Sequence, residues 1–176
     1  MTAKSESPYL LNLHELPRRA GEFKDYQLAF PAPEEIGTPL LAIPKGEQIE
    51  IKVRAESVSD GVLLTGEVKS RAKGECGRCL DPLDEDIDQR FQELFNYEGR
   101  SEDEDDETFA LDGDLADIEI PIRDAVVLAM PLNPICDESC LGLCPECGEK
   151  LADLPEDHNH PKSDPRWSGL AGWQQQ

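Results

Sequence analysis

The stretch "QIEIKVRAESVSDGVLLTGEVKSRA", residues 48–72, alternates apolar and polar side chains on both sides of a turn. The apolar positions of its first half are Ile49, Ile51, Val53 and Ala55. Alternation of this kind predicts a half-buried strand. "SDG" at 59–61 supplies a turn, and the residues from 62 to 72 are expected to run back as a second strand. The sequence therefore predicts an antiparallel β-hairpin over residues 48–72.

The segments that flank this hairpin predict an α+β protein. "DEDIDQRFQELFNYE", residues 84–98, fits a helix by spacing and a strand by alternation, and its Phe, Tyr and Ile residues favour the strand. Apolar residues at helical spacing predict one main helix at about 118–130, with Pro121 in the first turn and Pro131 as the stop. Pro and Gly in the first 35 residues favour extended segments and turns. We expect antiparallel hairpins or a sheet, one helix and a Cys-rich zinc-binding module.

Acidic residues dominate the charge of the chain. Its 176 residues are 38% hydrophobic and carry a formal net charge of −21. The excess centres on "SEDEDDETF", residues 101–109, which predicts a solvated acidic loop over about 100–113. A second interpretation is a polyanionic arm that masks a basic partner protein.

No apolar run of about 18 residues occurs, and the first residues lack the pattern of a signal peptide. We therefore expect a cytoplasmic protein with no membrane partner. In that reducing compartment, paired cysteines favour metal or redox chemistry over structural disulfides. The expected organisation is a single domain over residues 1–162, with the metal-binding segment at 136–160, followed by a tail at 163–176.

Six cysteines fall into two groups, "GECGRCL" at 74–80 and "PICDESCLGLCPECGEKL" at 134–151. "CGRC" and "CPEC" have the spacing of a zinc knuckle, a turn that presents two thiolates to one ion. Glycine is favoured after the second cysteine of a knuckle, as at Gly148. The sequence therefore predicts one or two zinc ions.

Two groupings of the ligands remain open at this stage. Two histidines follow the last cysteine, which gives eight candidate ligands: Cys76, Cys79, Cys136, Cys140, Cys144, Cys147, His158 and His160. One grouping joins the first four cysteines and pairs the last two with the histidines. The other joins the two CxxC pairs as in a zinc ribbon, and it leaves Cys136 and Cys140 idle, so we favour the first. His14 is expected to be a surface or core histidine.

Other chemistries for these cysteines are a redox dithiol and an iron–sulfur cluster. A redox CxxC normally opens a helix in a βαβ unit, which this sequence does not predict. Because every ligand position is filled by protein, and no H-E-x-x-H, nucleophile elbow or phosphate-binding loop is present, we expect a structural metal, no enzyme activity and no small-molecule substrate.

Taken together, "GECGRCLDPL", "ELFNY", "RDAVVLAMPLNPICDESC", "GLCPECGEKLAD" and "DHNHPKSDPRWSGL" resemble the YceD family of large ribosomal RNA subunit accumulation proteins, in its actinobacterial form. The resemblance covers roughly residues 10–170 and implies a small α+β domain without enzymatic activity. By this resemblance the six cysteines correspond to the family's cysteine positions. Some members lack equivalents of Cys144 and Cys147, so the shared function need not depend on that pair.

The resemblance implies a factor in large-subunit biogenesis, with ribosomal RNA or a pre-ribosomal particle as partner. Four basic residues beside the first knuckle are candidate RNA contacts: Lys69, Arg71, Lys73 and Arg78. They are equally compatible with an ordinary charged hairpin edge. Two further hypotheses are a chaperone-like acidic protein that binds a basic ribosomal protein without touching RNA, and a thiol oxidoreductase.

Overall fold

The computed structural model describes residues 7–97 and 109–160. The tail at 163–176, the domain boundary at 162 and nearly all of the acidic run 101–109 lie outside the described residues. Within the described part the strands are β1 (Leu10–Asn12), β2 (Phe23–Pro31), β3 (Ile36–Gly37), β4 (Leu41–Ile43), β5 (Gln48–Ser57), β6 (Gly61–Glu75), β7 (Pro82–Asn96), β8 (Phe109–Ala110) and β9 (Leu115–Asp117). The helices are α1 (Glu119–Ala129) and the short 3-10 helix η2 (Leu151–Asp153).

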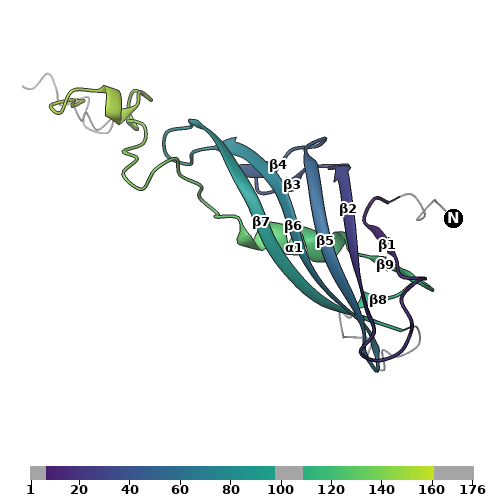
Figure 1. Cartoon of the computed structure of the whole chain (residues 1–176). Helices are drawn as coiled ribbons and strands as arrows, with labels where there is room; N and C mark the ends of the chain where they lie inside the picture. Colours follow the sequence, from purple (N-terminus) through teal and green to yellow (C-terminus); the bar gives the residue numbers. More distant parts are fainter. Residues whose placement is uncertain (1–6, 98–108, 161–176) are drawn as a thin grey trace, which may run out of the picture.

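The predicted hairpin forms the centre of the main sheet (Figure 1). β5 pairs antiparallel with β6 over Glu50–Ser57 and Val62–Lys69, and β7 pairs antiparallel with the whole of β6. The segment that fitted both a helix and a strand is therefore a strand, as predicted. Its burial repeats every four residues, at Leu83, Ile87, Phe91 and Phe95. Long cross-strand pairing determines this structure more than the local helical spacing does.

β2, β3, β4 and β5 extend the sheet on the side of β6 that faces away from β7, whereas β1 and β9 pair with each other in a separate two-stranded sheet. β5 covers the first half of this side of β6, and β4 pairs with Lys73 and Gly74 further along it. β2 pairs with β5 over its full length, and β3 pairs with β4. The sheet is antiparallel except at β8, which runs parallel to the end of β7. Of the segment expected as an acidic loop, about 100–113, the structure describes only the end, where Phe109 and Ala110 form β8.

One face of the sheet is covered by α1, which lies across the strands on the far side in Figure 1. Its buried residues are Pro121, Ile122 and Val126, and the flanking Ile118 and Met130 continue the same face at four-residue spacing. The predicted helix at about 118–130 is confirmed, with Pro121 in the first turn and Pro131 just beyond the last. The observed fold is thus the predicted α+β class. The chain leaves α1 toward the end of the β6–β7 hairpin, where the cysteines lie.

Candidate metal centres

The first knuckle is the connection between β6 and β7. The backbone N–H of Leu80 donates to the carbonyl of Cys76 at 2.9 Å, and the N–H of Cys76 donates to the carbonyl of Asp81 at 2.7 Å. These two bonds close a turn that holds both thiols on one side. In this turn Leu80 has a φ of 60°, which lies in the left-handed region that is unfavourable for residues with a Cβ atom.

The second knuckle repeats this turn at residues 144–149. The N–H of Gly148 donates to the carbonyl of Cys144, and the N–H of Cys144 donates to the carbonyl of Glu149, both at 2.8 Å. Gly148 has a φ of 75° and occupies the position that Leu80 has in the first knuckle. Two segments far apart in the sequence therefore adopt the same turn, because the C-x-x-C spacing and the position that follows it demand the same backbone path.

The first thiol cluster joins the hairpin to the segment after α1. Cys76, Cys79, Cys136 and Cys140 place their sulfur atoms within 4.8 Å of one another. The Sγ atoms of Cys79 and Cys136 are 3.6 Å apart, and those of Cys76 and Cys140 are 3.9 Å apart. Four thiolates about 2.3 Å from one zinc ion would be about 3.8 Å apart at a tetrahedral site. The donor set therefore fits one tetrahedral, thiophilic ion.

Backbone donors and neighbouring thiols act in opposite directions on this cluster. Backbone N–H groups of Cys79, Cys136 and Arg78 point at the sulfur of Cys76 and, against the effect of burial, lower its pKa to about 6. The N–H of Asp81 also favours the thiolate of Cys79, yet burial and the neighbouring thiols outweigh it and raise that pKa to about 12. One thiolate therefore disfavours deprotonation of the neighbouring thiols. A bound cation offsets this repulsion because it stabilises all four anions.

The second cluster consists of Cys144, Cys147, His158 and His160, whose ligand atoms also lie within 4.8 Å of one another. The Sγ of Cys147 is 3.7 Å from the Nε2 of His158, near the separation of about 3.6 Å expected around zinc. The Nε2 of His160 is buried and has no hydrogen-bond partner among the described residues, as expected of a nitrogen that serves as a metal ligand. The backbone N–H of Cys147 is the main cause that lowers the pKa of Cys144 to about 6.

The structure groups the eight candidate ligands as four cysteines and as two cysteines with two histidines. This is the first of the two groupings considered above, and it leaves none of the six cysteines idle. All six thiols are free. Neither knuckle opens a helix: the first joins two strands, and the 3-10 helix η2 begins only after the second. The arrangement thus lacks the setting of a redox dithiol.

Two residues that the sequence pattern did not single out connect the knuckles. The Sγ of Cys79 donates to a carboxylate oxygen of Asp81 at 3.4 Å, and the other oxygen is 2.5 Å from the Nζ of Lys150. Lys150, and to a lesser degree Cys79, lowers the pKa of Asp81. Asp81 lies two residues after Cys79, and this closeness to the first knuckle is the sequence signal that could have identified it. A second link is the backbone bond from the N–H of Leu143 to the carbonyl of Arg78.

The four candidate RNA contacts lie on β6 and in the first knuckle, and each is engaged by another group. Lys69 pairs with Glu67 and Asp88, Arg71 with Asp84 and Asp86, and Lys73 with Glu47. Arg78 differs, because its guanidinium donates to the carbonyls of Glu138 and Cys140. The register of β6 against β7 brings acidic residues of the following strand beside the basic ones. These four side chains therefore do not form an uncompensated basic patch.

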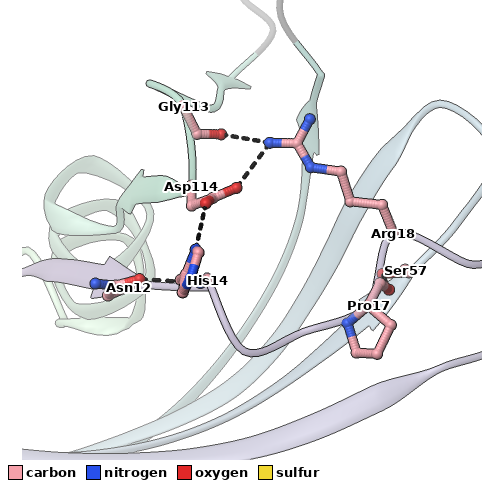
Figure 2. A network of polar contacts seen from close by, with 7 residues as sticks. All are labelled: Asn12, His14, Pro17, Arg18, Ser57, Gly113 and Asp114. Carbon is pink, nitrogen blue, oxygen red and sulfur yellow. Dashed lines mark hydrogen bonds and ion pairs between the residues drawn. The ribbon is translucent and has the colours of Figure 1, made fainter.

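His14 lies in a different polar cluster, together with Arg18 and Asp114 (Figure 2). Its Nδ1 is 2.9 Å from one carboxylate oxygen of Asp114, and Arg18 contacts the other oxygen at 2.7 Å. The hydrogen bonds with His14 and Arg18 lower the pKa of Asp114. His14 is 80% exposed, in line with a surface histidine. The cluster fastens the N-terminal segment to the turn before β9.

Fold and site together define a class of protein: an antiparallel sheet with one covering helix and two thiol-rich clusters suited to metal ions. The chain belongs to the YceD family. The matching family model is described as "Large ribosomal RNA subunit accumulation protein YceD", and it covers residues 64–173. The match spans β6 from Leu64 onward, all of β7 and α1, and both clusters. The description names a role in accumulation of ribosomal RNA and no catalysed reaction.

Relatives extend the match to nearly the whole chain. Uncharacterized proteins of Mycobacterium bovis and Mycobacterium tuberculosis are each 40% identical over 167 residues, which is 93% of this chain and 80% of the relative. Uncharacterized protein YlbN of Bacillus subtilis is 22% identical over 92% of each chain. No solved structure matches the chain. Among residues 7–97 and 109–160, no helix has the length and apolarity that a membrane crossing needs.

Proposed function

We propose that the protein is a non-enzymatic, zinc-binding factor that supports accumulation of large-subunit ribosomal RNA in the cytoplasm. One observation carries the proposal: four thiols from distant segments converge on the geometry of a tetrahedral ion within a YceD-family fold. Because protein supplies all four ligands, no position is left for a metal-bound water, and the ion serves the structure. Each cluster is proposed to hold one zinc ion.

We propose that the function depends on the metal ion of the first thiol cluster. It holds the segment after α1 against the end of the β6–β7 hairpin, and the links from Asp81 to Lys150 and from Arg78 to Leu143 then orient the second knuckle. The carbonyl contacts of Arg78 depend on this arrangement. A zinc ion therefore builds one continuous surface from three segments of the chain.

Within that surface, Arg78 is the strongest of the four candidate RNA contacts, because carbonyls rather than carboxylates hold its guanidinium. Lys69, Arg71 and Lys73 would exchange a carboxylate partner for a phosphate. Exposed ion pairs of this kind contribute only about 0–1 kcal/mol to stability, so the exchange has a small free-energy cost. Direct contact with ribosomal RNA is thus proposed chiefly at Arg78.

Complementation combined with RNA crosslinking tests this function. A bacterial host that lacks its own family member receives the wild-type chain, a Cys136→Ser/Cys140→Ser variant or Arg78→Ala. We expect the wild type to restore the ratio of large- to small-subunit ribosomal RNA, and the cysteine variant to fail. Arg78→Ala should crosslink less RNA while keeping its metal content. An unchanged RNA ratio in the host without the protein would refute the proposed function.

The acidic chaperone-like alternative is favoured by a separate observation. Carboxylates match three of the four basic residues beside the first knuckle, Lys69, Arg71 and Lys73, and β7 carries five acidic residues against one basic residue. Such a surface repels phosphate and attracts a basic protein. Restored RNA levels without any RNA crosslink to the protein would favour this alternative over direct RNA contact.

A further inference from the structure

Over most of its length, the outer edge of β7 has no strand paired with it among the described residues, and we call it the open edge. β7 pairs with β6 on one side, whereas on the other side β8 reaches only Phe95 and Asn96. Among the residues that the structure describes, no strand pairs with that side from Pro82 to Leu94, and β7 forms the outer strand in Figure 1. A strand edge of this length presents a row of backbone donors and acceptors to an added strand.

A groove lies beside this open edge, on the face of the sheet that α1 covers. It has a volume of about 290 Å³ and lies between β7 and the connection from α1 to the first metal cluster. Its apolar lining includes Leu41, Ile87, Met130 and Ile135. This volume is at the lower limit of small-molecule sites, so it suits a few side chains rather than a cofactor.

Exposed leucines continue the apolar surface at the end of α1. Leu128 is 85% exposed and Leu132 is 89% exposed, and they flank the groove residues Ala129, Met130 and Pro131. Single exposed leucines are common on protein surfaces. Here they adjoin a groove and an open strand edge, which together make an extended surface.

The charge of the groove determines which partner fits. Side chains alternate along β7, so Glu85 and Gln89 lie on the same face as the buried Ile87, and both line the groove. Glu85 is exposed and makes no ion pair with the described residues, whereas Asp84, Asp86 and Asp88 on the opposite face pair with cations of β6. The rim of the groove therefore carries an unmatched negative charge.

We propose that the open edge of β7 and its groove bind an extended, basic segment of another protein by strand addition. Main-chain hydrogen bonds to β7 supply the affinity, and side chains at alternate positions supply the specificity. A lysine or arginine of the segment pairs with Glu85, and a neighbouring apolar side chain on the same face enters the groove. RNA does not fit this surface because its phosphates would face the carboxylates of β7. The proposal does not depend on the role in RNA accumulation.

The test uses the full-length, zinc-loaded chain and a fluorescein-labelled synthetic peptide as long as the open edge. At every second position of the peptide, lysine alternates with leucine or valine, so that basic and apolar side chains share one face, and threonine fills the positions between. Two control peptides replace lysine by glutamate or introduce proline at alternate positions. We expect binding of the lysine peptide alone, measured by fluorescence anisotropy. Hydrogen exchange should slow at residues 83–93, and peptide contacts should slow it at 129–135.

Three variants locate the binding site. Glu85→Lys should weaken binding about tenfold because like charges then meet, and Ala129→Trp should abolish binding because the indole fills the groove. Glu50→Lys, an identical charge change on the exposed face of β5, should leave the affinity unchanged. All three positions are exposed, so metal content and circular dichroism should match the wild type.

Equal binding of the proline peptide would overturn the proposal, because attraction by charge alone would then suffice. Equal loss in Glu85→Lys and Glu50→Lys would overturn it for the same reason. Protection of the β7 edge by a ribosomal RNA fragment, in place of the peptide, would also refute it. Each of these results leaves the complementation result unaffected, so the two proposals fail independently.

Discussion

Release of the far segment from the first cluster should destabilise the whole fold. The variant Cys136→Ser/Cys140→Ser removes both ligands contributed by the segment after α1. Cys136 is exposed and Cys140 is half-buried. Serine therefore leaves no cavity in the core, and the lost stability reports the cross-link itself. Elemental analysis should find one zinc ion fewer, or one that is bound more weakly.

The expected magnitude follows from the loop that the ion closes. Cys79 and Cys136, whose sulfurs are 3.6 Å apart, are 57 residues apart in the chain. If the ion is treated as a cross-link of that span, it removes chain entropy from the unfolded state worth about 4 kcal/mol. We expect the free energy of unfolding in urea, with zinc in the buffer, to fall by about this amount.

A matched control removes two ligands of the second cluster, with His158→Ala/His160→Ala. There the ion closes a loop of only 11 residues, from Cys147 to His158, and that loop lies beyond the sheet and α1. The unfolding of the sheet should therefore change by less than about 1 kcal/mol, although one ion is lost. In a strong chelator, the wild type and the cysteine variant should become equally stable.

The reasoning is refuted if the cysteine variant unfolds at the same urea concentration as the wild type in zinc buffer. It is equally refuted if the histidine variant loses as much stability as the cysteine variant. The first result would mean that the ion does not cross-link the distant segments. The second would mean that the two clusters form one cooperative unit.

Three further predictions concern single residues. Leu80→Gly should keep or raise stability by up to about 1 kcal/mol in thermal unfolding, because its φ is positive, whereas Gly148→Leu should weaken zinc retention in the second cluster. Because the folded-state pKa of Asp114 is lowered, its contribution is present above about pH 4 and is lost as the pH falls. The stability difference from Asp114→Asn should therefore shrink in acid, and a constant difference would contradict this. Burial raises the pKa of Tyr9 to about 12, so the wild type should lose stability between about pH 10 and 12, and Tyr9→Phe should lose less.

Local sequence signals were sufficient for the elements. The alternation at Ile49, Ile51 and Val53 and the turn at 59–61 predicted the hairpin because strand side chains point alternately to opposite faces. Helical spacing predicted α1 because residues three and four positions apart lie on the same face of a helix. The two knuckles were predictable because each turn is closed by hydrogen bonds within six consecutive residues.

Pairing between distant segments could not be predicted in this way. Ligand spacing allowed Cys76 and Cys79 to join either Cys136 and Cys140 or the second knuckle, and only the folded chain distinguishes these groupings. The neutralisation of the basic residues has the same origin, because the register of β7 on β6 places Asp84 and Asp86 within reach of Arg71. Local residue patterns do not predict such a register, because it is fixed only when the core residues of both strands pack together.

The sequence alone determined the hairpin, the helix, both knuckles and the family resemblance, since each depends on residues that are near neighbours or on motifs read in order. Tertiary structure decided which thiols share a cluster, which charges are neutralised and which strand edge stays open. The physical reason is the same in each case. Contacts between residues 57 to 64 positions apart form only when the sheet and α1 bury their apolar faces together.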